Sequence, residues 1–281
     1  MASNHELQAR YATLVDKKLR ASLVKKPGIF WNTRYEGNPK AGMVKIPVRD
    51  AEVAIKTYDR NNGADMTFGA TSYLDMPINK EYAVNELIDG YEAAAVPDNL
   101  VADRLDSAGY SMSFQVEKDG TACLESAATA LGDTTAITPE TIYGLIVDAR
   151  TAMGNAYVPN DGRRWLAATP TTLGIILKSH EFISASSLGD EVKQTGALGR
   201  IAGFNVYEDP TLSATTDFIV GHPDWCHFVE EWKVPIAINN LADGKHIGAS
   251  AVQGRSVYGF LVSKAKTLYI KKNAGAGGGG G

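Results

Sequence analysis

The segment from Arg163 to Leu212 constrains the fold of this chain more than any other part of the sequence. Trp165 to Ala168 predicts a short apolar strand. Thr169 and Pro170 then supply an N-cap and a first-turn proline for a short helix that continues through Leu177. The chain is therefore expected to pass directly from a buried strand into a helix.

A polar run from Ser184 to Thr195 follows, and after it comes a glycine-punctuated stretch from Gly196 to Tyr207. There, Ile201, Phe204 and Val206 suit a buried strand that is interrupted by a bulge or a turn. The whole segment predicts a strand, a helix and a returning strand, and it carries no catalytic group in a recognisable setting.

Length and composition are those of a globular protein. The chain has 281 residues, 44% of them apolar, which is enough for one large or two smaller domains with a sizeable core. No run approaches the ~20 apolar residues of a membrane span, and the N-terminus lacks the basic-then-apolar order of a secretory signal. We expect a protein that is made and kept in the cytoplasm. Cys123 and Cys226 are too few for a disulfide framework and too far apart for a metal motif, so buried or incidental thiols are expected.

Positive charge is concentrated at the N-terminus. The first 40 residues hold eight basic side chains against three acidic ones, a net charge of +5, which leaves −9 for the rest of a chain whose net charge is −4. One explanation is a solvated helix face, and the other is an arm that meets an acidic neighbour or lies near nucleic acid. Because no base-reading motif is present, any contact with nucleic acid would be directed at phosphates.

The same N-terminal segment predicts an amphipathic helix. Ser3 and Glu6 have the spacing of a capping box. The apolar stripe that follows, which needs a partner surface, consists of Leu7, Tyr11, Val15, Leu19 and Leu23. Residues 26–28 end this helix, and the next three residues form an apolar cluster that is expected to be exposed in a loop and to act as a docking point. These three residues are Ile29, Phe30 and Trp31.

From Met43 to Ile78 the apolar residues recur with a period of two, which predicts a long hairpin. Pro47 and Pro77 each remove a backbone donor, so both strands are expected at edges. A two-stranded ribbon is only marginally stable in water, so this hairpin must lean either on its own domain or on another molecule. The candidate contact residues at and near its polar tip are Lys56, Asp59, Arg60, Asn61, Asn62 and Asp65.

Two longer helices are predicted after the hairpin. One starts at Pro97 and Asp98, and Gly109 and Gly120 weaken it by up to ~1 kcal/mol each, so a bend or break is expected near either glycine. Thr138 is expected to cap the other helix. The apolar face of this second helix consists of Ile142, Leu145, Ile146, Ala149 and Met153, and Gly154 closes it.

The C-terminal third is rich in predicted strands, at residues 218–220, 235–238, 258–262 and 268–270. Helices and strands are mixed without regular alternation, which indicates an α+β fold. Residues 274–281 are glycine and alanine, and because such residues bury no large side chain we expect a flexible tail.

The sequence shows no positive sign of an enzyme. Gly196, Gly199 and Gly203 have the wrong spacing for a dinucleotide-binding fingerprint. Neither cysteine lies in a motif that activates a nucleophilic thiol. One cluster has the ligand types that zinc prefers, and it consists of His222, Cys226, His227, Glu230 and Glu231. Its first part has the form of a turn, and the adjacent Cys226 and His227 would point to opposite faces of a strand. We therefore predict no catalytic, cofactor or metal site.

The stretch ATPTTLGIILKSHEFI followed by GALGRIAGFNVYED resembles the A-domain of tailed-phage major capsid (coat) proteins of the Hong Kong 97 type, near the capsomer centre. The resemblance covers most of residues 1–273 and is strongest over 163–221 and 234–273. It implies a Hong Kong 97-like capsid fold with the following parts: an N-terminal arm (1–40), an extended β-hairpin or E-loop (41–80), a spine helix and peripheral domain (81–160), an axial domain (161–255), return strands to the peripheral domain (256–273) and the tail (274–281).

This resemblance implies a major capsid protein that self-assembles through pentamers and hexamers into the icosahedral head shell of a tailed phage with double-stranded DNA. The hairpin and the arm would then clamp neighbouring subunits, through Ile29, Phe30, Trp31 and the hairpin residues named above. The implied partners are a portal protein, a scaffolding protein and DNA held by non-specific contact, with assembly in the host cytoplasm.

Some members of this family join lysine to asparagine covalently between subunits. Lys45, Lys56, Asn61 and Asn62 are of suitable type, but no glutamate aligns to activate them, so crosslinking is not predicted. Two alternatives stay open. One is an encapsulin, which shares the fold and stores a cargo enzyme in place of DNA, and the other is a soluble α+β enzyme with an unrecognised site.

Overall fold

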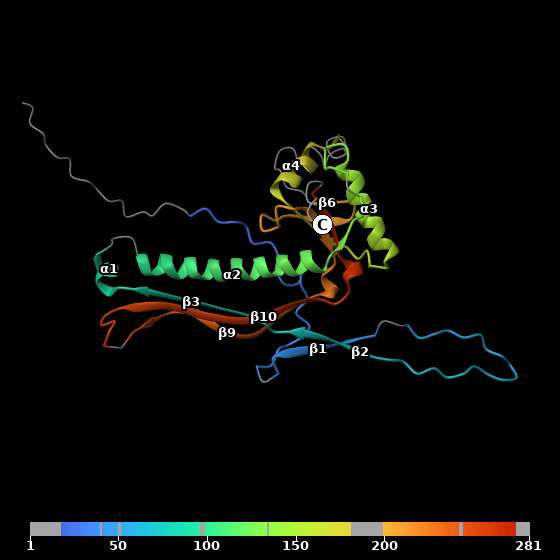
Figure 1. Ribbon diagram of the computed structural model, residues 1–281, viewed down its shortest axis with the longest axis horizontal. Helices are drawn as coiled ribbons and strands as arrows, with labels where there is room; N and C mark the ends of the chain where they lie inside the picture. Colours follow the sequence, from blue (N-terminus) through green and yellow to red (C-terminus); the bar gives the residue numbers. More distant parts are fainter. Residues whose placement is uncertain are drawn as a thin grey trace, which may run out of the picture. The chain divides into compact units, whose positions relative to one another are not determined.

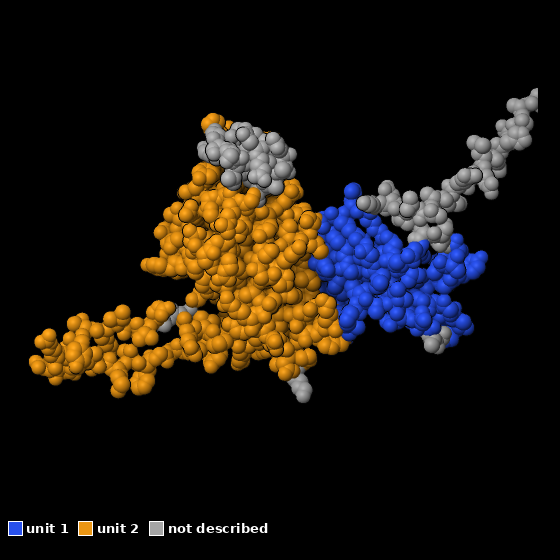
Figure 2. Space-filling view, turned by 180° about the vertical axis from the view of Figure 1, so that it is seen from behind, with its two compact units in different colours: residues 1–21, 82–114, 234–255 blue, residues 22–81, 115–233, 256–281 orange. Residues whose placement is uncertain are grey.

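The computed structural model describes residues 18–39, 41–49, 52–95, 99–133, 135–180, 199–241 and 244–273. The chain divides into two compact units, shown in different colours in Figure 2. Unit 1 comprises residues 1–21, 82–114 and 234–255, and unit 2 comprises residues 22–81, 115–233 and 256–281.

Figure 1 labels most of the helices and strands. The helices are α1 (Gly90–Ala95), α2 (Leu100–Ala127), α3 (Ile142–Asn155) and α4 (Pro170–Lys178), with 3-10 turns η1 (Pro223–Trp225) and η2 (Ala265–Thr267). The strands are β1 (Met43–Val48), β2 (Ser72–Pro77), β3 (Lys80–Ile88), β4 (Thr129–Ala130), β5 (Trp165–Ala168), β6 (Arg200–Ile201), β7 (Phe204–Glu208), β8 (Thr216–Gly221), β9 (Cys226–Asn240), β10 (Ser250–Val262) and β11 (Tyr269–Lys272). This mixture confirms the predicted α+β class. Within the described part of the chain, no helix combines the length and apolar character needed to cross a membrane.

The core of unit 2 is built around a six-stranded sheet in the order β4-β11-β8-β5-β7-β6. Strand β5 lies in the middle, parallel to β7 and antiparallel to β8. Because successive side chains of a strand point to opposite faces, Leu166 and Ala168 join one buried cluster while Trp165 and Ala167 join another. The five apolar residues predicted to form one face of α3 are all buried in the first of these clusters.

The predicted passage from a buried strand directly into a helix is confirmed. The Thr169 side chain accepts a hydrogen bond from the Thr172 backbone N–H at 3.2 Å, and Pro170 is the first residue of α4. The interruption before Phe204 is a turn between β6 and β7, in which Ala202 and Gly203 both have positive φ.

Two predictions about the helices are wrong in detail. Helix α2 runs without a break through Gly109 and Gly120, and a Cβ at position 120 would lie 3.0 Å from the ring of Trp31. The glycine at 120 therefore permits close packing and does not end the helix. The N-cap of α3 is Thr141 in place of Thr138, because residues 139–141 form a turn in which the Thr141 hydroxyl accepts from the Thr138 backbone N–H.

The predicted N-terminal helix falls mainly on residues 1–17, which lie outside the described residues. Residues 18–26 contain no helix, and Leu19 is fully exposed, so the prediction is wrong for this part. The backbone N–H groups of Val24 and Lys25 bond to the Glu117 carboxylate, which replaces the carbonyl partners that a helix would use.

Unit 1 contains part of a three-stranded sheet in the order β3-β10-β9. Its small core includes Ile88, Ala108 and Val252, against which Leu105 and Ile236 pack. Along β3 the side chains alternate between more and less exposed, as expected for a sheet with one covered face.

The domain boundaries inferred from the resemblance remain a prediction. Strands β4 and β11 lie outside residues 161–255 but belong to the six-stranded sheet, whereas β9 and most of β10 lie inside that range and pair with β3. Sheet membership therefore does not follow contiguous stretches of sequence.

Gly221→Ala should destabilise the subunit by about 1–3 kcal/mol, because a Cβ there would lie 2.5 Å from the indole of fully buried Trp165 on the neighbouring strand. The matched control is Gly109→Ala in α2, where nothing lies within 4 Å of the added Cβ and a gain of up to about 1 kcal/mol is expected. Urea denaturation followed by tryptophan fluorescence measures both. Equal stability of the two variants would contradict the packing described for Trp165.

Candidate functional site

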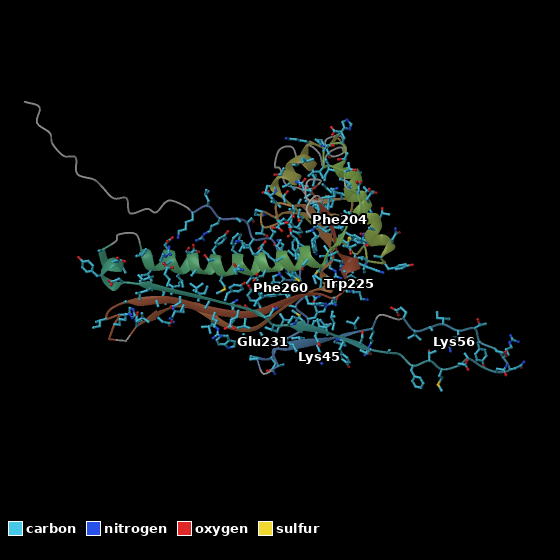
Figure 3. All side chains as sticks on the ribbon, in the orientation of Figure 1. Lys45, Lys56, Phe204, Trp225, Glu231 and Phe260 are labelled. Carbon is cyan, nitrogen blue, oxygen red and sulfur yellow. The ribbon has the colours of Figure 1, made fainter. Side chains whose placement is uncertain are left out.

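The hairpin of unit 2 has a packed base and an unpacked end. Strands β1 and β2 pair antiparallel from Met43 opposite Pro77 to Val48 opposite Ser72. At the base, Ile46 and Met76 are buried with Val229 of β9. Beyond Val48 and Ser72 the chain continues as what we call the hairpin extension, residues 52–71. Figure 3 places Lys45 near the base and Lys56 far out on this extension.

The tip of the extension is held by a local turn. The backbone N–H and carbonyl groups of Asp59 and Gly63 bond to one another at 3.1 and 2.8 Å, and Gly63 has a positive φ. The Asp59 carboxylate accepts the backbone N–H of Asn61 at 2.7 Å and that of Asn62 at 3.4 Å. These bonds hold the pKa of the Asp59 carboxyl below its usual value. Asp59 thus shapes the turn, and its carboxylate already accepts hydrogen bonds from the backbone.

The structure brings the sequence-predicted hairpin residues together at this end of the hairpin. Lys56, Arg60 and Asp65 are exposed, and none has an ion pair among the described residues. Sequence reasoning missed the apolar side chains beside them, which are between 71% and 102% exposed: Val53, Ile55, Tyr58, Met66 and Phe68. The extension therefore presents both unpaired charges and uncovered apolar groups.

The prediction that the apolar triplet of the arm is an exposed docking point is wrong. Phe30 and Trp31 are 0% and 2% exposed, and Ile29 packs beside them in the same cluster. The Phe30 ring lies 4.5 Å from that of Trp165, and the Trp31 ring lies 4.6 Å from that of Phe260, which Figure 3 labels. A turn at Gly28, which has φ +85°, directs the triplet inward.

Charged contacts also fix the arm to unit 2. Lys25 is buried and forms an ion pair with the fully buried Asp209, and its ammonium group donates to the Thr211 hydroxyl at 2.9 Å. Glu117 of α2 lies 3.9 Å from the same ammonium group. Because a buried charge is stable only when it is paired, residues 22–32 form part of the body of unit 2.

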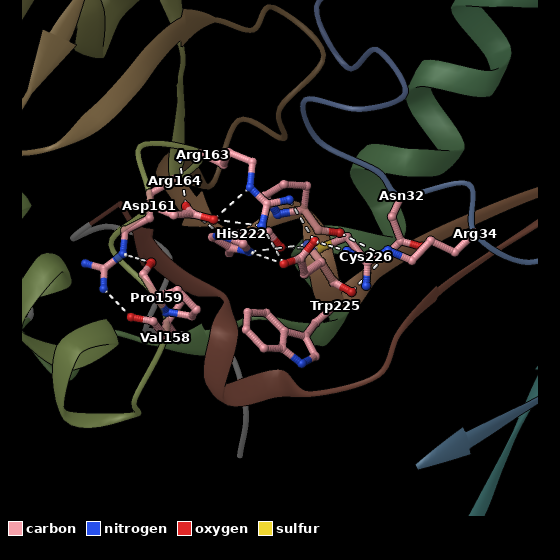
Figure 4. Close-up of polar contacts among 12 residues, drawn as sticks. Asn32, Arg34, Val158, Pro159, Asp161, Arg163, Arg164, His222, Trp225 and Cys226 are labelled. Atoms are coloured by element: carbon pink, nitrogen blue, oxygen red, sulfur yellow. Dashed lines mark hydrogen bonds and ion pairs between the residues drawn. The ribbon is translucent and has the colours of Figure 1, made fainter. Parts of the chain in front are cut away.

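A second polar network, drawn in Figure 4, joins the loop before β5 to η1. Arg163 donates to Asp161 at 2.7 Å and to both carboxylate oxygens of Asp224 at 2.9 and 2.7 Å. His222 Nδ1 accepts the Asp224 backbone N–H, so its Nε2–H points to Asp161 at 3.1 Å. Desolvation alone would raise the pKa of Asp161, but the hydrogen bonds from Arg163 and His222 hold it well below the usual value.

Asp161, His222 and Asp224 are close enough for one metal ion, since their possible ligand atoms lie within 4.8 Å of one another. The Arg163 guanidinium already bridges the two carboxylates, and Arg34 also pairs with Asp224. A cation would have to displace this bridge. The geometry is that of an internal ion-pair network that joins loop, turn and arm.

The two histidines of the zinc-like cluster, His222 and His227, bond to different residues and do not converge on one site. His227 bonds to Asn32 Oδ1 through Nδ1 at 2.9 Å and to the Ser263 hydroxyl through Nε2 at 3.0 Å. Asn32 in turn donates to the carbonyls of Pro223 and Asp224, so its Oδ1 accepts from His227. Burial raises the pKa of the Cys226 thiol, which makes this residue a poor metal ligand.

The pH dependence of stability should report on His227. Burial, together with the nearby Arg34 charge, lowers its pKa from 6.5 to about 4. At a pH between these two pKa values, His227 binds a proton in the unfolded chain but not in the folded chain. The stabilising contribution, about 1–3 kcal/mol, is therefore complete above pH ~6.5 and is lost as the pH falls towards 4. His227→Gln should remove this part of the pH dependence in denaturation measured at pH 7 and pH 4.5. Identical pH dependence in both proteins would show that His227 is not held neutral by the fold.

Comparison with known proteins agrees with this architecture. A family model described as phage capsid protein matches residues 89–270, well over half of the chain, and the chain therefore belongs to the phage capsid protein family. No curated protein sequence matches it. It is a major capsid protein of a tailed phage that self-associates into the head shell, and its place is in the virion.

Solved structures show the same fold at low identity. One titled Mycobacterium phage Che8 has 21% identity and a TM-score of 0.80, with 96% of this chain and 98% of that chain covered. The capsid of cyanophage P-SCSP1u has 12% identity and a TM-score of 0.75, with 95% and 92% covered. The capsid of an empty GTA particle has 14% identity and a TM-score of 0.68, with 95% of each chain covered. The predicted Hong Kong 97-like capsid fold is confirmed.

Proposed function

We propose that the hairpin extension binds a neighbouring copy of this chain and that this contact joins subunits into pentamers and hexamers of an icosahedral shell. The observation that carries the proposal is the row of five uncovered apolar side chains on residues 52–71. Monomeric proteins rarely leave so many adjacent apolar groups in water, and a two-stranded ribbon is only marginally stable by itself. A neighbouring subunit would supply the missing surface, and the shell contains many such neighbours.

The contact residues proposed on this surface are Lys56, Asp59, Arg60, Asn61, Asn62 and Asp65, together with the apolar side chains beside them. Asp59 and Asn62 act by shaping the tip, while Lys56, Arg60 and Asp65 offer charges to the neighbour. Ile29, Phe30 and Trp31 are not proposed as contacts, because their own subunit buries them.

Replacing Ile55 and Phe68 by serine should leave the subunit folded, because both side chains are fully exposed, and should reduce the yield of particles by about tenfold or more. Phe68→Leu is the matched control, since it keeps the apolar surface and should assemble. Circular dichroism checks the fold, and sedimentation with negative-stain microscopy counts particles. Normal particles from the double serine variant would remove the extension from the assembly contact.

We further propose that the closed shell holds double-stranded DNA through non-specific phosphate contacts, and that a portal protein and a separate scaffolding protein take part in assembly in the host cytoplasm. The sequence supports a phosphate contact, since its first 40 residues carry a net charge of +5 against −9 over the remaining chain, although Lys25 and Arg34 are already paired with Asp209 and Asp224. The absence of catalytic function stays a prediction.

Particles purified from infected cells should protect a genome-length DNA from added nuclease. Particles made by this chain alone should be fewer or irregular in size without a scaffolding protein. A protein cargo in place of protected DNA would favour the encapsulin alternative, and closed shells of uniform size from the chain alone would contradict the need for scaffolding.

A further inference from the structure

A pocket of about 500 Å³ lies in unit 2 between the arm and strand β9. Its walls include Pro27, Tyr35, Glu36, Gly37, Phe228 and Glu230. Tyr35 also packs on the apolar cluster at the base of the hairpin, so the pocket lies beside that base. None of the residues of the Asp161–Arg163–Asp224 ion-pair network lines this pocket.

The pocket carries more negative than positive charge. Glu36 has no ion pair or hydrogen bond within the described part of the chain. Glu230 accepts from the Ser256 hydroxyl at 3.1 Å and pairs with Lys233 at 3.0 Å, both through Oε1. Two carboxylates, those of Glu36 and Glu230, therefore line the pocket, and Lys233 pairs with the second of them.

Glu231 lies directly behind the pocket wall. A Cβ at Gly37 would be 2.9 Å from the Glu231 Cβ, so the glycine allows this close approach. The Oε1 atom of Glu231 is shielded from water and has no hydrogen-bond partner. A shielded carboxylate oxygen without a partner is costly, and positive charge close to the Glu231 side chain would reduce that cost.

The side walls of the pocket are aromatic. Tyr35 and Phe228 are half-buried and present ring surface to the cavity. A planar guanidinium stacks on aromatic rings and binds carboxylates through two hydrogen bonds at once. Glutamates and aromatic rings together therefore suit an arginine side chain.

We propose that this pocket receives Arg60 from the hairpin tip of a second copy of the chain, an inference that rests on the intersubunit role proposed for the hairpin. Arg60 lies in the turn that Asp59 organises, is exposed, and has no ion-pair partner among the described residues. The Asp59 carboxylate is engaged by backbone N–H groups, which leaves the arginine available for an external carboxylate.

The hairpin cannot fill the pocket of its own subunit. The pocket adjoins the base of the hairpin, whereas about ten residues on each side separate the base from the tip, roughly 30 Å at ~3.3 Å per residue. Figure 3 shows the extension leaving the body of unit 2. The arginine that enters must therefore come from another copy.

A charge exchange tests the pairing. Arg60→Glu and Glu36→Arg should each lower the yield of particles by about tenfold or more, because each places like charges together, and the double variant should recover to within about threefold of the unmodified chain. Lys56→Glu is the matched control: it makes the same change of charge on the same hairpin, and Glu36→Arg should not rescue it. Circular dichroism of the variants checks that each subunit is folded.

One more variant, in which a short Gly-Ser link replaces residues 59–65, separates the two proposals. If that variant assembles normally, the intersubunit role of the tip fails. Suppose instead that the linker variant does not assemble. The pocket assignment is then overturned, and the role of the hairpin stands, if Arg60→Glu and Glu36→Arg each assemble normally. The same conclusion follows if the double variant yields no more particles than either single variant.

Discussion

A ribbon of two strands has two faces and no interior, and this constraint governs how the subunit can function. At the base, one face of the hairpin packs on β9 through Ile46, Met76 and Val229. Farther out, none of the described residues of unit 2 supplies such a surface, and Ile55 and Phe68 are left fully exposed. Apolar groups of this size are stable in water only at a cost, which a neighbouring surface removes. The extension is therefore the surface that we propose a second copy covers.

The N-terminal arm shows the opposite behaviour. Phe30 and Trp31 fill the space between Trp165, Tyr207 and Phe260, and Lys25 neutralises the buried Asp209. These contacts make residues 22–32 a component of the core of unit 2, so the arm cannot leave without exposing a charge and several aromatic rings. Arg34, two residues beyond this segment, pairs with Asp224, which also pairs with Arg163 of the loop before β5. The described part of unit 2 thus combines a firmly packed body with an uncovered hairpin extension.

Local sequence patterns predicted the helices and strands well, but they predicted poorly which distant residues contact them. The strand at Trp165, the cap at Thr169 and the buried face of α3 depend on neighbouring residues, and the structure confirms them. The prediction that residues 29–31 are exposed is wrong because the rings that cover them, Trp165 and Phe260, are more than a hundred residues away in the sequence. The partners of His227 in the predicted zinc-like cluster also come from distant segments, since its ring bonds to Asn32 and Ser263. No local signal could have located the pocket at Glu36, whose walls come from the arm and from β9.

The amino-acid sequence alone determined the α+β class, the long hairpin with its polar tip and the helix faces, because periodicity, proline and capping residues act over a few neighbouring positions. It also carried the resemblance that the family match then established over residues 89–270. Only the tertiary structure decided which apolar groups are buried and which remain uncovered, and which carboxylates lack a partner. Burial and charge pairing depend on segments brought together from distant parts of the chain, and such contacts leave no periodic trace in the sequence.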